Sequence, residues 1–77
     1  MTYRGLRERL RDQYGCHLRG VDLSFTAIGG LFFVVERTVD GKTRQTTLQG
    51  GDGEQVPREI VEVTCDRLGI KRSEFGC

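Results

Sequence analysis

The sequence predicts an α+β domain in which a helix, three antiparallel strands and a second helix follow one another. Apolar residues recur at helical spacing near both ends of the chain, and they alternate with polar residues through its middle. A glycine pair and an Asp-Gly pair separate the alternating segments, as in β-hairpins. The chain has 77 residues, room for one domain, residues 1–77. We expect a three-stranded antiparallel meander with two helices packed on one face.

The first helix is expected in the segment TYRGLRERLRDQYG. Thr2 is a suitable N-cap, because its hydroxyl can accept a hydrogen bond from a free backbone N–H of the first turn. Gly15 can end the helix in the left-handed conformation. The apolar stripe of this helix, at a spacing of three or four residues, consists of Tyr3, Leu6, Leu10 and Tyr14.

Three strands are expected next, in residues 21–28, 31–39 and 42–49. The first, VDLSFTAI, alternates apolar and polar residues, the mark of a half-buried strand. Gly29-Gly30 can form a two-residue hairpin turn, because glycine adopts positive φ without strain. Asp40-Gly41 is the strongest hairpin signal in the chain. The sequence therefore predicts a meander in which neighbouring strands are joined by short turns.

The second helix is expected after the loop GGDGEQ, residues 50–55. Pro57 suits the first turn of a helix, and Gly69 is expected to end the helix with Ile70 folding back in a Schellman cap. Phe75, in the short tail, is expected to pack against the body of the domain. The buried face of this helix is predicted to consist of Ile60, Val61, Thr64, Cys65 and Leu68.

Two-residue turns would fix the register of the strands, and the register decides which side chains share each face of the sheet. Arg37 would lie opposite Arg44, Asp22 beside Arg37, and Phe25 opposite Val34. One face would then carry Leu23, Phe25, Ala27, Phe32 and Val34, and the other would carry Ile28, Leu31, Phe33, Val35 and Leu48. Both faces are apolar near the glycine pair, and the two helices can cover one of them.

An exposed apolar patch usually marks an interaction surface. We therefore expect a non-enzymatic interaction module that docks onto a protein partner, or onto a second copy in a homo-oligomer. The expected interface residues are Ile28, Leu31, Phe33, Val35 and Leu48. The alternative is a longer glycine turn, which would shift the strand register and leave one face mostly polar.

A second hypothesis is a nucleic-acid-binding module, with RNA as the expected ligand. Residues 1–20 hold five arginines against two carboxylates, whereas residues 50–77 hold six carboxylates against four basic residues. A row of arginines on one helix can follow a phosphate backbone. The candidate anion-binding residues are Arg4, Arg7, Arg11, Arg37 and Arg44. The alternatives are a solvated helix face for the first three and, for the last two, solvated arginines beside Asp22.

The sequence carries no complete catalytic, metal-binding or cofactor-binding motif. The three cysteines, Cys16, Cys65 and Cys77, include no close pair that would suggest a zinc site or a disulfide framework. Cys16 directly precedes the single histidine, His17, but adjacency in sequence does not make a thiolate–imidazole pair in space. We therefore predict no catalytic residue, no metal and no cofactor. Without an apolar segment long enough for a membrane span or a leader, we expect a cytoplasmic location and no membrane partner.

The order of elements and the ending LGIKRSEFG resemble the HicA toxin family, RNA-cleaving proteins with a fold similar to double-stranded-RNA-binding domains. The matching residues are Leu68, Gly69, Ile70, Glu74 and Phe75, together with the Asp40-Gly41 hairpin. The family carries a Gly-Ser-His-His-like segment, with its catalytic histidine, where this chain has Gly29, Gly30, Leu31 and Phe32. The resemblance thus implies an RNA-related fold whose cleavage chemistry has been lost.

Overall fold

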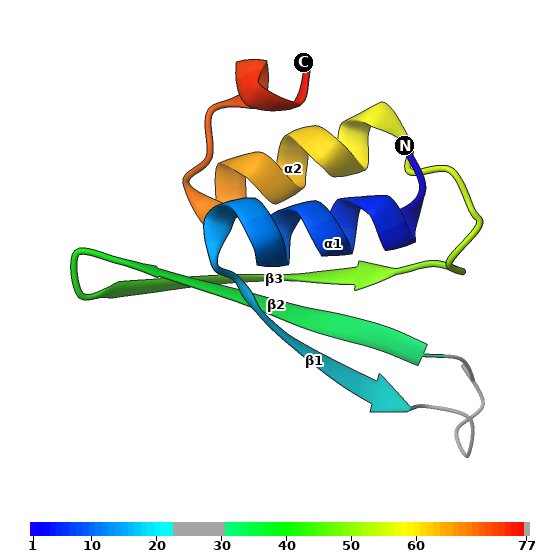
Figure 1. Cartoon of the computed structure of the whole chain (residues 1–77), viewed down its shortest axis with the longest axis horizontal. Coiled ribbons are helices and arrows are strands. Elements are labelled where there is room, and N and C mark those ends of the chain that lie inside the picture. The colour runs from blue at the N-terminus through cyan, green and yellow to red at the C-terminus, as the bar shows by residue number, and fades with distance from the viewer. Residues whose placement is uncertain (23–30, 77) are drawn as a thin grey trace.

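The structure, a computed structural model, describes residues 1–22 and 31–76, with Asp22 and Leu31 described by their backbone alone. In chain order the elements are α1 (Tyr3–Tyr14), β1 (His17–Asp22), β2 (Leu31–Val39), β3 (Lys42–Gln49), α2 (Arg58–Leu68) and a short 3-10 helix, η1 (Arg72–Phe75). The strands form one antiparallel sheet in the order β1-β2-β3, and both α-helices lie over the same face of it (Figure 1). The predicted α+β fold and order of elements are confirmed.

The ends of α1 follow the predicted capping residues. The Thr2 hydroxyl accepts a hydrogen bond from the backbone N–H of Gly5 at 3.0 Å. Gly15 adopts the left-handed conformation, with φ of 63°, and its N–H donates to the carbonyl of Leu10. Both bonds satisfy backbone groups that a helix end leaves without partners, so the predicted capping residues mark the two ends of this helix.

The end of α2 is the predicted Schellman cap. Gly69 has a φ of 69°, its N–H donates to the carbonyl of Asp66, and the N–H of Ile70 donates to the carbonyl of Cys65 at 2.8 Å. Ile70 is buried, as the cap's hydrophobic contact requires. At the other end, Pro57 precedes the helix with an extended ψ of 145° instead of lying in its first turn.

The hairpin between β2 and β3 has the predicted two-residue turn. Asp40 and Gly41 both have positive φ, 53° and 76°, the signature of a type I′ turn. The predicted pairing follows from it, with Arg37 opposite Arg44 and Phe33 opposite Leu48. The register of this half of the sheet is therefore confirmed.

The prediction for the first strand was wrong. The strand begins at His17 instead of Val21, and Asp22 pairs with Leu31 instead of lying beside Arg37. Gly29-Gly30 and most of the expected strand lie outside the described residues. The pairing of Asp22 with Leu31 gives a register that a two-residue turn at Gly29-Gly30 would not produce, as the alternative of a shifted register expected.

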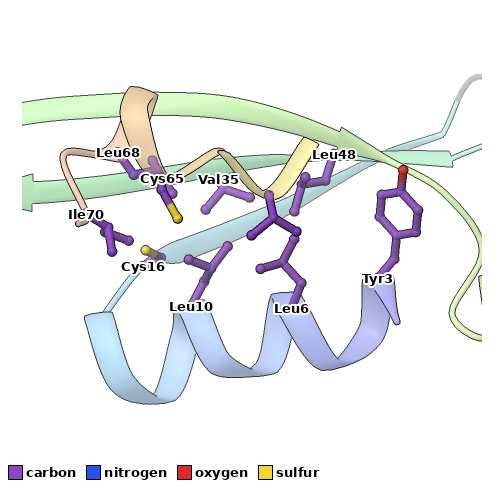
Figure 2. Close-up of a cluster of buried hydrophobic side chains, with 10 residues drawn as sticks. Tyr3, Leu6, Leu10, Cys16, Val35, Leu48, Cys65, Leu68 and Ile70 are labelled. Atoms are coloured by element: carbon purple, nitrogen blue, oxygen red, sulfur yellow. The ribbon is translucent and has the colours of Figure 1, made fainter. Parts of the chain in front are cut away.

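The core lies between the sheet and the two helices (Figure 2). Leu6 and Leu10 of α1 meet Val35 of β2 and Leu48 of β3, all at most 2% exposed. Removing this apolar surface from water is the main favourable term in folding a small domain. The buried cluster consists of Tyr3, Leu6, Leu10, Cys16, Val35, Leu48, Val61, Cys65, Leu68 and Ile70.

The tail packs on α1, as expected for Phe75. Its ring stacks on the ring of Tyr14 with centroids 5.6 Å apart. The guanidinium carbon of Arg9 lies 4.1 Å from the same ring centroid, and Arg9 donates a hydrogen bond to the carbonyl of Glu74. These contacts hold the short η1 helix against α1, at the edge of the buried cluster.

The expected docking face was assigned to the wrong side of the sheet. Val35 and Leu48 are 0% and 2% exposed beneath the helices, and Phe33 on the same face is half-buried. Ile28 lies outside the described residues, and Leu31 is described by its backbone alone. Val35 and Leu48 pack against the apolar stripe of α1, so these two residues cannot contact a partner.

The uncovered face is mostly polar among the described residues. Its register places Val21 opposite Phe32, and Val34 between Arg19 and Thr47. Val21 and Phe32 are half-buried, and Val34 is buried despite the absence of a helix on this side. The remaining members of this face are His17, Glu36, Thr38, Thr43, Gln45 and Gln49.

Gly50 is expected to be essential for stability because of its close approach to Tyr3. A Cβ at Gly50 would overlap the buried Tyr3 ring, whereas a Cβ at Gly51 would meet nothing within 4 Å. Gly50→Ala should therefore lower the free energy of unfolding by about 1–3 kcal/mol, measured by urea denaturation. Gly51→Ala is the matched control and should change it by less than about 0.5 kcal/mol. Equal stability of the two variants would contradict this packing.

Candidate anion-binding site

A hollow beside α1 brings together the three arginines of that helix. Arg4, Arg7 and Arg11 are spaced three and four residues apart, so they share one side of the helix, next to its apolar stripe. The hollow has a volume of about 660 Å³ and opens to solvent. It is lined by Arg4, Arg7, Glu8, Arg11, Cys16, His17, Leu18, Phe33 and Asp52.

Arg7 forms the floor of this hollow. The residue is only 8% exposed, and its guanidinium carbon lies 4.3 Å from the centroid of the Phe33 ring. A cation over an aromatic face is attracted by the ring's electrons, and more strongly where water is excluded. Phe33 lies opposite Gly20 in the sheet, and the absence of a side chain there leaves the ring without a cross-strand neighbour on β1. Arg7 is thus held in one position by β2.

Asp52 supplies the counter-charge to Arg7. Its carboxylate accepts a hydrogen bond from Nη2 of Arg7, forming an ion pair between residues 45 positions apart in sequence. A charged side chain as buried as Arg7 requires such a partner. Sequence reasoning missed Asp52, because the composition of the loop GGDGEQ gave no indication of which helix it would meet.

The other two arginines are exposed and paired locally. Arg4 donates from Nε to Glu8 at 3.1 Å, one helical turn away. Arg11 donates from Nε to Asp12 at 2.9 Å, and this bond lowers the pKa of the Asp12 carboxyl and raises that of Arg11. Ion pairs between exposed side chains contribute little stability and exchange readily with solvent ions. Both arginines therefore remain able to meet an external anion.

No catalytic group emerges at the hollow from the residues that the structure describes. Burial raises the pKa of the Cys16 thiol, which keeps it protonated and a poor nucleophile. His17 lies exposed at the rim. Over the same residues, no cluster of three or more His, Cys, Asp or Glu side chains could hold a metal ion. The hollow is chemically suited to binding an anion, because three guanidinium groups line it.

The remaining two predicted anion-binding residues, Arg37 and Arg44, lie elsewhere, at the carboxyl end of α2. Arg37 donates from Nη1 to the carbonyls of Leu68 at 2.9 Å and Gly69 at 3.1 Å. The Arg44 guanidinium packs over Gly69, its Nε 3.1 Å from where a Cβ would lie. Cations stabilise the negative end of a helix dipole. This role in the fold accounts for two arginines facing each other, and their expected neighbour Asp22 pairs with Leu31 instead.

Comparison with protein-family models, with curated proteins and with solved structures found no match. The resemblance to HicA toxins therefore stays a prediction. Along the described residues, no helix is long and apolar enough to cross a membrane.

Arg7 and Arg4 are expected to differ sharply in their contribution to stability. Arg7→Ala removes the contact with Phe33, the bond to Asp52 and a buried aliphatic stem, so the free energy of unfolding should fall by about 1–3 kcal/mol. Arg4→Ala removes one exposed pair and should change it by less than about 0.5 kcal/mol. Thermal and urea unfolding of both variants measure this difference, and an Arg7→Ala variant as stable as Arg4→Ala would show that the hollow's floor is not fixed.

Proposed function

We propose that this chain is a small non-enzymatic RNA-binding module that uses the hollow beside α1 as its phosphate-binding surface. The observation that carries the proposal is the gathering of three helical arginines at one hollow, next to an aromatic ring. Guanidinium groups match the geometry of phosphate oxygens and form paired hydrogen bonds with them. A cytoplasmic location belongs to the proposal, because three cysteines without a close pair suit a reducing compartment.

The spacing of the arginines suits a run of phosphates. Arg4 and Arg11 are separated by seven residues on α1, which corresponds to about 10 Å along the helix axis. Even in duplex DNA the charges of one strand follow one another about every 3.4 Å along the axis, so a length of about 10 Å is enough to span more than one phosphate. Arg7 lies between them and is held rigid, so it costs little conformational entropy to use. A strand lying along α1 can therefore meet all three cations in turn.

Local carboxylates moderate the charge of the hollow. Glu8 and Asp52 line it together with the three arginines, so the surface is only weakly basic. Binding to such a surface depends on several phosphates acting together, because each exchanged ion pair yields little free energy on its own. The α-β-β-β-α order, which the HicA resemblance associates with RNA, favours RNA over DNA as the ligand.

Removing two exposed arginines should weaken RNA binding. Arg4→Gln combined with Arg11→Gln should lower the affinity for RNA by about tenfold at moderate salt and reduce the slope of log affinity on log salt by about two. Fluorescence polarisation with labelled RNA and DNA of one sequence, over a series of salt concentrations, measures both quantities and the preference for RNA.

The matched control for this experiment is Arg58→Gln combined with Arg67→Gln. These arginines are exposed on α2 and do not line the hollow, and the change in net charge is the same. The proposal requires the control to bind nearly as well as the unmodified chain. An equal loss of affinity in both double variants would mean that only net charge matters.

Self-association through the uncovered sheet face is a second candidate. One observation favours it: Val21 and Phe32 lie opposite each other, half-exposed, on the side that no helix covers. The same face carries Arg19 and Glu36, which would complement each other across a two-fold axis between two copies. A second copy of this chain is therefore the occupant that this face suits best.

The second candidate is tested by Phe32→Asp. If the face is a dimer interface, the unmodified chain should dimerise with rising concentration in sedimentation velocity, and this variant should remain monomeric because a charge replaces the central apolar side chain. Gln45→Asp adds the same charge at an exposed polar position of the face and should weaken the dimer less. A monomeric unmodified chain at every concentration would remove this candidate.

A further inference from the structure

Asp52 is already bound to Arg7, the arginine that the proposed ligand would need most. Its carboxylate accepts a hydrogen bond from the Arg7 guanidinium, the most buried cation of the hollow. A carboxylate and a phosphate present similar pairs of oxygens to a guanidinium. The unliganded protein therefore already holds an anion of its own at this arginine.

The two partners differ strongly in how firmly they are held. The Arg7 side chain is 10% exposed, with Phe33 against it, whereas the Asp52 side chain is 67% exposed. Releasing the carboxylate would return an already exposed side chain to water, while the buried guanidinium left behind would require another anion in its place. Releasing the arginine would require unpacking it from the ring. Asp52 is the replaceable member of the pair.

The loop that carries Asp52 is anchored by its backbone. The N–H of Tyr3 donates to the carbonyl of Glu54 at 3.0 Å, and the N–H of Arg4 donates to the carbonyl of Asp52 at 3.4 Å. The N–H of Val56 donates to the carbonyl of Met1 at 2.9 Å. None of these bonds involves the Asp52 side chain, so its carboxylate can leave Arg7 while the loop stays in place.

We propose that Asp52 is an internal competitor for the phosphate of the ligand, bound to Arg7 in the free protein and displaced when RNA binds. This inference rests on the proposed function and adds a selection step to it. A ligand's apparent affinity is reduced by the fraction of protein in which Arg7 is free. A lone phosphate gains too little binding free energy at Arg7 to displace Asp52. A strand that also binds Arg4 and Arg11 gains enough binding free energy to displace it, so the site selects consecutive phosphates.

Glu8 does not have the same role. It pairs with Arg4 between two exposed side chains one helical turn apart, and neither partner is fixed by packing. Such a pair is formed and broken by side-chain motion alone and contributes little. Asp52 differs because it lies in a loop distant in sequence and is paired with Arg7, whose side chain is fixed by packing against Phe33.

The test is Asp52→Asn, measured by fluorescence polarisation with labelled single-stranded polyuridylate as the probe. We expect the variant to bind the probe about threefold more tightly than the unmodified chain, and to be slightly less stable because Arg7 loses its counter-charge. Asp40→Asn is the matched control. It makes the same charge change in a turn that accepts asparagine, and it should leave affinity within measurement error.

The outcomes separate this inference from the proposed function. Unchanged or weaker binding by Asp52→Asn, with the unmodified chain still binding, would overturn the inference. Weaker binding would show in addition that Asp52 positions Arg7 for the ligand. An equal gain in Asp40→Asn would also overturn it, since net charge alone would explain the gain. No binding by either chain, both folded by circular dichroism, would overturn the proposed function itself. Asp52→Glu keeps the charge and should bind like the unmodified chain.

Discussion

The burial of one sheet face by the two helices is the constraint on which the rest of the structure depends. Both α-helices that the structure describes lie over the face that carries Val35 and Leu48. Packing Leu6 and Leu10 of α1 against that face fixes the helix beside the sheet. It also decides which residues can reach a partner, because Val35 and Leu48 are buried beneath the helices, whereas Phe33 at the edge of the same face lines the open hollow.

The same packing explains why an arginine lies almost buried in so small a protein. Arg7 follows Leu6 on α1 and lies at the margin of the apolar stripe. When the stripe packs on the sheet, the Arg7 side chain is therefore buried as well. Burying a cation costs free energy unless charge and hydrogen bonds are supplied. Phe33 and Asp52 supply them here, from a strand and a loop that are distant in sequence. A rigid cation at the floor of an open hollow is the result.

Features that depend on residues adjacent in sequence were predictable. They are the Thr2 and Gly15 caps of α1, the Schellman cap at Gly69, and the Asp40-Gly41 turn with its register. The first strand was not, because Gly20 and the polar residues around it conceal the alternation that the segment after Val21 displays. The covered face was not predictable either, since both faces of β2 are apolar near its start. The row of arginines on α1 was predicted from the sequence. The pairing of Asp52 with Arg7 was not, because it is a tertiary contact that no local sequence pattern indicates.

The central claim is that α1 and the loop after β3, and not the uncovered sheet face, form the binding surface. Amide chemical shifts in two-dimensional NMR spectra, followed as single-stranded RNA is added, test it most directly. The account predicts that the largest changes fall on residues 4–11 and 51–54. Changes confined to the uncovered face, around Phe32 and Thr47, would contradict it.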